Sequence, residues 1–138
     1  MQRKTVFDTC IYIDIFNDNK NVDQINWTDN VTFLAYPVFH ELMTGAGSNK
    51  EATFYQEFAD RFLKLERLIF PSFHTLNLIG QTCYRMRKNG KLDPSMPKHY
   101  NDICIALLAR QIGATVVTKN KKDFDLIDSF VDIKCEYI

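Results

Sequence analysis

Short β-type segments alternate with helix-type segments along the whole chain, and this alternation restricts the possible folds more than any other feature. The strand-like segments are residues 4–7, 32–36, 67–70, 115–118 and 132–137. The helix-like segments are residues 9–16, 37–46, 51–65, 73–88, 101–112 and 120–128. Because such alternation favours parallel strands joined by right-handed helical crossovers, the sequence predicts a three-layer α/β fold. Helices are expected to flank a central parallel sheet of about five strands.

Two polar stretches interrupt the alternation and are predicted to be loops. Residues 18–30 are rich in Asn and Asp, and a short helical turn is expected near Trp27. Residues 89–98 contain Gly90, Pro94 and Pro97. The 138 residues include no internal repeat, low-complexity segment or obvious linker. We therefore expect residues 1–138 to form a single domain.

Composition narrows the cellular setting. No apolar run approaches the roughly 20 residues that a membrane helix needs, and no apolar segment of signal-peptide length opens the chain. A cytoplasmic protein with no membrane partner is therefore expected. The cysteines are scattered, without a C-x-x-C pair or zinc-ligand spacing, which favours free thiols. They are Cys10, Cys83, Cys104 and Cys135. Because 17 basic residues balance 17 acidic ones, nucleic acid can be bound only through local patches.

Four acidic residues fall where an open parallel sheet places its ligands, beyond the carboxyl ends of the strands. Asp8 directly follows the first strand, and Asp123 follows the fourth. Asp102 opens the helix that leads into the fourth strand, and Glu41 lies on the helix after the second. Three of them have a simpler alternative. Asp8 could cap a helix, Asp102 could stabilise a helix N-terminus through the helix dipole, and Asp123 could be a solvated loop acid. Glu41 is harder to dismiss, because it borders the apolar stripe of its helix.

Taken together, the four carboxylates predict a cation site. Carboxylates held close to one another repel and resist full ionisation, so a site that keeps them needs positive charge. Hard oxygen ligands suit Mg²⁺ or Mn²⁺. Such an ion activates a bound water and stabilises the charge that develops on a phosphate. No histidine base is required, and His99 is better interpreted as a surface-loop residue.

Three segments of the chain resemble the motifs of one family, the PIN-domain ribonucleases. VFDTCIYIDIF (residues 6–16) is similar to the opening strand, Asp-Thr pair and helix of that family. VFHELMTGA (38–46) is similar to its second motif, and NDICIALLARQIGATVVTKNKKDF (101–124) to its third. The third segment is the most specific, because the spacing holds over more than twenty residues. The nearest resemblance is to VapC-type toxins of type II toxin–antitoxin pairs, and the resemblance spans nearly the whole chain.

The resemblance implies a PIN-like fold and a metal-dependent endoribonuclease that hydrolyses RNA with Mg²⁺, for which Mn²⁺ substitutes. It implies that the catalytic and metal-binding residues are Asp8, Glu41, Asp102 and Asp123. Supporting polar roles near the metal or phosphate fall to Thr118 and Asn120, while Thr9 either binds through its hydroxyl or caps a helix. Cys10 departs from the family, in which Ser or Asn is frequent. The implied partners are RNA, a cognate antitoxin protein and a second copy of the chain in a homodimer.

RNA binding requires positive charge near the acids, and two basic clusters are candidates. The first comprises Arg85, Arg87, Lys88, Lys91 and Lys98. The second comprises Lys119, Lys121 and Lys122. An ordinary solvated face is the alternative for each cluster. The aromatic stripe of Phe54, Phe58 and Phe62 belongs either to the core or to a dimer face.

Two other functions remain possible, and two further α/β classes lack a required residue. A noncatalytic PIN-like RNA- or protein-binding module would keep the fold but lose acids, and all four are present. A PIN nuclease acting in RNA processing or on DNA would use the same acids. A phosphoacceptor receiver domain needs an Asp after the third strand, where the sequence has Phe70, Pro71 and Ser72. A haloacid-dehalogenase-like phosphatase needs Asp-x-Asp after the first strand, but Cys10 occupies the second position.

Overall fold

The computed structural model describes residues 2–18, 30–91, 93 and 95–138. The helical turn predicted near Trp27 lies outside these residues. Within them, no helix is long and apolar enough to cross a membrane.

The predicted parallel sheet is confirmed, with five strands in the order β3-β2-β1-β4-β5. The strands are β1 (Arg3–Phe7), β2 (Asn30–Ala35), β3 (Leu68–Ile69), β4 (Thr115–Thr118) and β5 (Cys135–Tyr137). Every neighbouring pair is parallel. β1 lies at the centre, and Thr5 pairs with Thr32 on one side and Thr115 on the other. The carboxyl ends of β1 and β4, which are followed by Asp8 and Asp123, therefore lie side by side.

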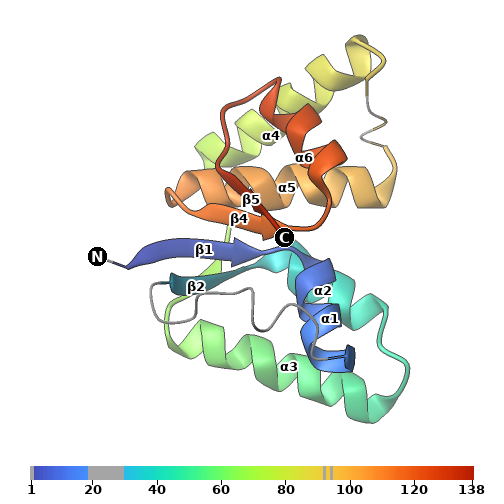
Figure 1. Ribbon diagram of the computed structural model, residues 1–138, viewed down its shortest axis with the longest axis vertical. Helices are drawn as coiled ribbons and strands as arrows, with labels where there is room; N and C mark the ends of the chain where they lie inside the picture. The colour runs from blue at the N-terminus through green and yellow to red at the C-terminus, as the bar shows by residue number, and fades with distance from the viewer. Residues whose placement is uncertain (1, 19–29, 92, 94) are drawn as a thin grey trace.

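Helices cover both faces of the sheet, as the alternation predicts. They are α1 (Thr9–Asp18), α2 (Tyr36–Thr44), α3 (Asn49–Lys64), α4 (Phe73–Lys88), α5 (Pro97–Gln111) and α6 (Lys121–Asp128). Figure 1 shows α1, α2 and α3 on one side of the sheet and α4, α5 and α6 on the other. The order of strands and helices is the order predicted from the sequence.

One boundary error matters for the site: α5 begins at Pro97, four residues before the predicted start. Pro97 sits in the first turn, where its fixed φ suits a helix and its missing N–H is no loss. The prediction that the loop extends to Lys98 was therefore wrong. Asp102 does not open the helix but lies in its second turn. Gly113, at φ 69°, follows the last turn of α5 in the left-handed conformation that helix ends favour.

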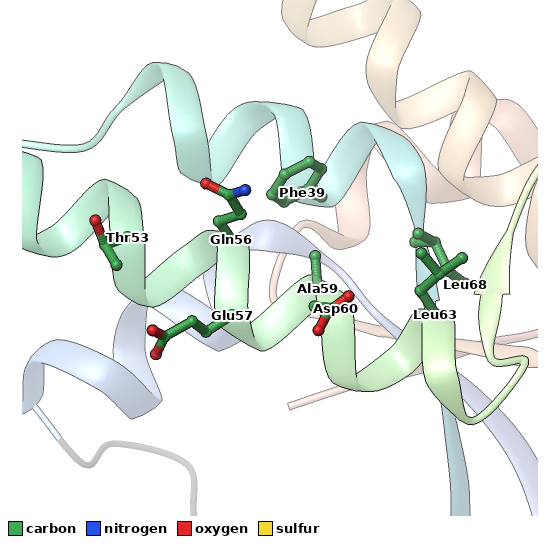
Figure 2. A pocket seen from close by; sticks show the side chains of 8 residues that line it. All are labelled: Phe39, Thr53, Gln56, Glu57, Ala59, Asp60, Leu63 and Leu68. Atoms are coloured by element: carbon green, nitrogen blue, oxygen red, sulfur yellow. The ribbon is translucent and has the colours of Figure 1, made fainter.

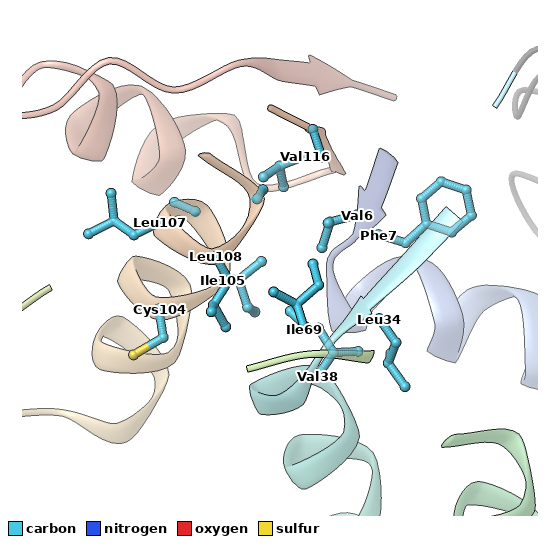
Figure 3. Close-up of a cluster of buried hydrophobic side chains, with 14 of the residues drawn as sticks. Val6, Phe7, Leu34, Val38, Ile69, Cys104, Ile105, Leu107, Leu108 and Val116 are labelled. Carbon is cyan, nitrogen blue, oxygen red and sulfur yellow. The ribbon is translucent and has the colours of Figure 1, made fainter. Parts of the chain in front are cut away.

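The core is centred on α5, which is buried at every position from 102 to 109. A helix that is buried all round is typical of the middle of a layered fold. Ile105 and Leu108 project toward Val6 and Val116 of the central strands (Figure 3), and all four are fully buried. This packing fixes the height and rotation of α5, and with it the position of Asp102.

The predicted aromatic stripe belongs to the core rather than to a free face. Phe58 lies 5.1 Å from Tyr12 and 5.2 Å from Phe16 between ring centroids. Phe62 is partly buried against the core, and Phe54 is 43% exposed at the outer end of the stripe.

Candidate active site

Asp8 lies at the carboxyl end of β1, where β4 and the start of α1 hold it in place. Its backbone N–H donates to the carbonyl of Val117 at 3.0 Å, which extends the contact of β1 with β4. Its Oδ1 accepts from the N–H of Thr9 at 2.8 Å, and its Oδ2 accepts from the hydroxyl of Thr118 at 2.7 Å. The residue is only 5% exposed. Asp8 is therefore rigidly placed, as its position after a central strand predicts.

Thr118 links this carboxylate to the loop that follows β4. It is fully buried, and its hydroxyl accepts from the backbone N–H of Asn120 at 3.0 Å while it donates to Asp8. Cys10 approaches the same pair, with its Sγ 3.5 Å from Asp8 Oδ2 and 3.8 Å from Thr118 Oγ1. Burial, followed by the negative charge of Asp8, raises the pKa of the Cys10 thiol. The thiol therefore stays protonated and donates to Asp8.

Asp102 is the most deeply buried of the predicted acids, at 2% exposure. Its Oδ2 lies 3.3 Å from the ammonium of Lys98 and 3.5 Å from the amide nitrogen of Asn120. Burial, and then the charge of Asp8, raises the pKa of Asp102 to about 7, although Lys98 acts in the opposite direction. Burial and the neighbouring carboxylate thus oppose the ionisation of Asp102 more strongly than Lys98 favours it.

Asp123 lies in the first turn of α6, beyond the end of β4. Its Oδ2 accepts from Asn120 Nδ2 at 2.9 Å and lies 3.8 Å from Lys98 Nζ. The amide of Asn120 and the ammonium of Lys98 therefore both bridge Asp123 and Asp102. Partial burial acts to lower the pKa of Lys98, but the charges of the neighbouring acids outweigh it and raise that pKa.

Glu41 approaches from α2, on the side of Asp8 and Thr9. Its Oε1 accepts from the Thr9 hydroxyl at 2.9 Å. Burial raises the pKa of Glu41, the Thr9 hydrogen bond lowers it, and the charge of Asp8 raises it again. Thr9 was expected either to bind through its hydroxyl or to cap a helix. Its hydroxyl donates to Glu41, so it contacts a side chain of the site.

The four predicted acids thus come together at one edge of the sheet. A hollow of about 330 Å³ there is lined by Asp8, Cys10, Lys98, Lys119, Asn120 and Asp123. Carboxylate, amide and hydroxyl oxygens are the hard donors that Mg²⁺ and Mn²⁺ take. The donor chemistry therefore fits such an ion. Across the described ranges, however, no three His, Cys, Asp or Glu side chains are spaced to hold one ion as they stand.

The basic residues predicted to bind RNA divide into those at the hollow and those engaged elsewhere. Lys98 and Lys119 line the hollow. Arg85 donates to the carbonyl of Phe130 at 2.9 Å and stacks on its ring, so it holds the chain after α6 against α4. Lys121 pairs with Asp125 at 2.6 Å.

The remaining basic candidates are not seen at the acids. Lys88 lies over the ring of Tyr84, and Arg87 lines a separate hollow beside α4. Lys91 and Lys122 are exposed. His99, placed in a loop by the sequence, lies in the first turn of α5, where its ring bonds to the carbonyl of Asp93 at 3.0 Å. His99 is thus partly buried in a helix, and its predicted position in a surface loop was wrong.

Asp14, a buried acid of α1 at 9% exposure, was not among the residues predicted from the sequence. Its Oδ2 lies 2.6 Å from the ammonium of Lys119, so the pair joins α1 to the loop that carries Asn120. The available signal was an acid between Ile13 and Ile15, on an otherwise apolar helix.

A larger hollow of about 570 Å³ lies away from the acids, between α2 and α3. Figure 2 shows Phe39 facing the turns of α3 that carry Gln56 and Ala59, with Leu63 and Leu68 at one end. Its acids, Glu57 and Asp60, stand on the surface of α3. The larger hollow is therefore separate from the predicted acids.

Comparison with solved structures shows that the fold is that of chains from VapBC complexes. A chain of VapBC2 from Rickettsia felis, bound to a DNA fragment from its promoter, matches with a TM-score of 0.69 and 23% identity, over 98% of each chain. A chain of VapBC-1 from nontypeable Haemophilus influenzae matches with a TM-score of 0.69 and 20% identity over 97% of each. A chain of DNA-bound VapBC from Salmonella typhimurium matches with a TM-score of 0.68 and 21% identity, over 99% of this chain and 98% of the other. No protein-family model and no curated protein matches the sequence.

Proposed function

We propose, from the VapC-type PIN fold and the acids at its sheet edge, that the protein is a divalent-metal-dependent endoribonuclease and the toxin of a toxin–antitoxin pair. The observation that carries the proposal is the meeting of Asp8, Asp102 and Asp123 beyond the ends of β1 and β4, with Glu41 beside them. Asp8 and Asp102 are almost fully buried. Buried carboxylates gathered in this way raise the free energy of the empty site and favour a cation.

Asp8, Asp102 and Asp123 would hold Mg²⁺ or Mn²⁺, and Glu41 would either join them or orient the attacking water. When bound, such an ion lowers the pKa of a water and stabilises the charge that develops on the phosphate. The chain itself fixes its acids: Thr118 orients Asp8, Thr9 orients Glu41, and Asn120 bridges Asp102 and Asp123. These contacts leave little reorganisation for the moment of reaction.

Positive charge at the hollow supports phosphate binding. Lys98 and Lys119 line it, and both are more than one third exposed. Phosphate contacts release counterions, so the affinity for RNA is expected to fall as the salt concentration rises. Because only these two lysines of the described residues line the hollow, the slope of log affinity against log salt concentration is expected to be small. Arg85 and Lys121 are engaged in the fold and contribute less.

Two protein partners belong to the proposal. An antitoxin from a separate chain is expected because the structural neighbours come from VapBC complexes. A homodimer is favoured by the outer face of α4, where Phe73, Leu76 and Tyr84 are 78%, 50% and 53% exposed. Sedimentation of the purified chain distinguishes a monomer from a dimer. A true antitoxin abolishes cleavage at a one-to-one ratio of chains.

A panel of structured RNAs and single-stranded DNA tests the activity, with Mg²⁺, Mn²⁺ or EDTA. The variants are Asp8→Asn and Asp102→Asn, and the matched control is Asp132→Asn, an exposed acid outside the three motif segments. Discrete RNA fragments that require metal, persist in the control and vanish in both site variants support the proposal. Cleavage of DNA but not RNA would replace ribonuclease by deoxyribonuclease. An absence of both cleavage and metal binding would favour the noncatalytic binding module.

A further inference from the structure

Lys98 reaches into the acidic site from the second residue of α5. Its ammonium lies 3.3 Å from Asp102 Oδ2 and 3.8 Å from Asp123 Oδ2. Its side chain is 62% exposed, so the ammonium has an open path back to solvent. The same two carboxylate oxygens are the ones that Asn120 contacts. Lys98 therefore occupies the side of the acids that faces the hollow.

The chemistry of the helix itself does not favour a lysine at this place. A cation in the first turn opposes the helix dipole, and a Lys four residues before an Asp is the weaker order for a helical ion pair. The first turn of α5 has no acidic residue, and Met96 provides no side-chain cap. The position of Lys98 is thus explained by the acids that it contacts rather than by the helix that carries it.

Because Asp102 is buried, its ion pair with Lys98 matters for stability. A carboxylate at 2% exposure is costly to ionise without a partner charge, and removal of that partner leaves the charge uncompensated. Lys98 supplies such a charge in the metal-free protein. A divalent ion held by Asp102 and Asp123 would need the carboxylate oxygens that Lys98 contacts in the metal-free protein. The two cations cannot share these oxygens without mutual repulsion.

We propose that Lys98 is a resident counter-ion, which holds Asp102 and Asp123 together while no divalent ion is bound and competes with that ion for them. The inference deepens the proposed function, on which it rests, by assigning Lys98 a positioning role at the same site. With an ion bound, the ammonium of Lys98 would move from the two acids toward the open side of the hollow. The affinity for the ion is consequently lower than the four acids alone would give.

This role predicts opposite changes in two properties of Lys98→Met. The metal-free variant loses the counter-ion of a buried acid, so its thermal midpoint in EDTA falls by about 3 to 6 °C. The same change removes a positive charge beside the ion, so the affinity for Mn²⁺ rises by about tenfold. Lys98→Arg keeps the charge and is expected to retain both properties. A side chain that merely supported the structure would lower both.

Lys50→Met is the matched control. Lys50 is also the second residue of its helix, α3, and is also exposed, but its helix does not carry the acids. The control therefore separates the effect of the site from that of removing a cation near a helix N-terminus. It is expected to leave the affinity for Mn²⁺ unchanged and to keep or slightly raise the thermal midpoint.

The experiment is a titration with Mn²⁺ alone, in which electron paramagnetic resonance measures the free ion, together with thermal unfolding in EDTA. A raised affinity with a lowered midpoint in Lys98→Met only supports the inference. An unchanged or lowered affinity for Mn²⁺ in Lys98→Met overturns the inference. So does a thermal midpoint that falls as far in Lys50→Met as in Lys98→Met. The failure of the proposed function is distinct: the opposite changes would persist, but no RNA would be cleaved. If neither the wild type nor Lys98→Met bound Mn²⁺, both proposals would fall.

Discussion

The hydroxyl of Thr118 donates a 2.7 Å hydrogen bond to Oδ2 of Asp8, across 110 residues of sequence. Asp8 directly follows β1 and Thr118 ends the neighbouring parallel strand β4, so the bond joins the carboxyl ends of the two strands at the candidate site. It also explains why a threonine, rather than another β-branched residue such as Val116 or Val117, ends β4. Thr118 is fully buried, so its hydroxyl has no water to replace this partner.

Replacement of Thr118 by Val tests that contact. The two side chains have similar shapes, but Val can neither donate to Asp8 nor accept from the N–H of Asn120, so Asp8 Oδ2 is left with the weak thiol donor of Cys10. We expect the free energy of unfolding to fall by about 1 to 3 kcal/mol and cleavage to fall with it, as measured by urea denaturation and RNA digestion. Thr118→Ser keeps the hydroxyl and is expected to retain more activity than Thr118→Val. Equal activity in the two variants would mean that the bond does not orient Asp8.

The acids predict that metal-free stability decreases as pH rises. Burial and the charge of Asp8 raise the pKa of Asp102 to about 7 in the folded protein, whereas the unfolded carboxyl titrates near about 4. Between these values the native state holds a proton that the unfolded state has lost. The free energy of unfolding therefore falls as pH rises from about 4 to about 7, by roughly 2 to 4 kcal/mol. The raised pKa of Glu41 acts in the same direction.

Urea denaturation in EDTA across this pH range measures the effect. Asp102→Asn cannot ionise, so its stability is expected to change less with pH than that of the wild type. Divalent metal is expected to flatten the wild-type curve, because it compensates the ionised carboxylates. A pH dependence that is identical in Asp102→Asn would assign the titration to other groups.

The fold itself is largely predictable from the sequence, because local signals agree with its layers. The β-branched run from Thr115 to Thr118 is a buried strand, and the apolar run after Asp102 is the central helix. Asp8 was placed correctly because it directly follows an apolar strand. These signals need only neighbouring residues, so they are accessible without the structure.

The start of α5 was not predictable in the same way. Pro94 and Pro97 indicate a loop by composition, yet Pro97 occupies the one helical position that tolerates proline. The error concealed the relation between Lys98 and Asp102, which becomes an i, i+4 pair only when the helix begins at Pro97. The pair of Asp14 and Lys119 was hidden for another reason: it joins residues that only the folded sheet brings together.

Truncation in the core is expected to be costly wherever α5 meets the sheet. Leu108 is fully buried, so Leu108→Ala is expected to lower the free energy of unfolding by about 2 to 5 kcal/mol. Leu76→Ala removes the same atoms from α4, where the side chain is 50% exposed, and is expected to cost less than about 1 kcal/mol. Urea denaturation of the two variants makes the comparison. Equal losses would contradict the central position of α5.

Replacement of Asn120 is expected to make the thermal stability depend on the divalent metal. Its amide donates to Asp123 at 2.9 Å and lies 3.5 Å from Asp102. Asn120→Asp keeps the shape but replaces this donor with a further negative charge. We expect a lower thermal midpoint than that of Asn120→Ala in EDTA, and a larger recovery when Mn²⁺ is added. A midpoint that did not respond to Mn²⁺ would show that Asn120 lies outside the influence of the ion.

Calorimetric titration of Mn²⁺ into the wild type, Asp102→Asn and Asp132→Asn tests the central claim most directly. Asp102 is buried between Lys98 and Asn120, whereas Asp132 is exposed. We predict equal affinity in the wild type and Asp132→Asn, and a loss of at least about tenfold, or 1.4 kcal/mol, in Asp102→Asn. Binding by Asp102→Asn that matched the wild type, or an absence of binding in all three, would contradict a metal-dependent site at these acids.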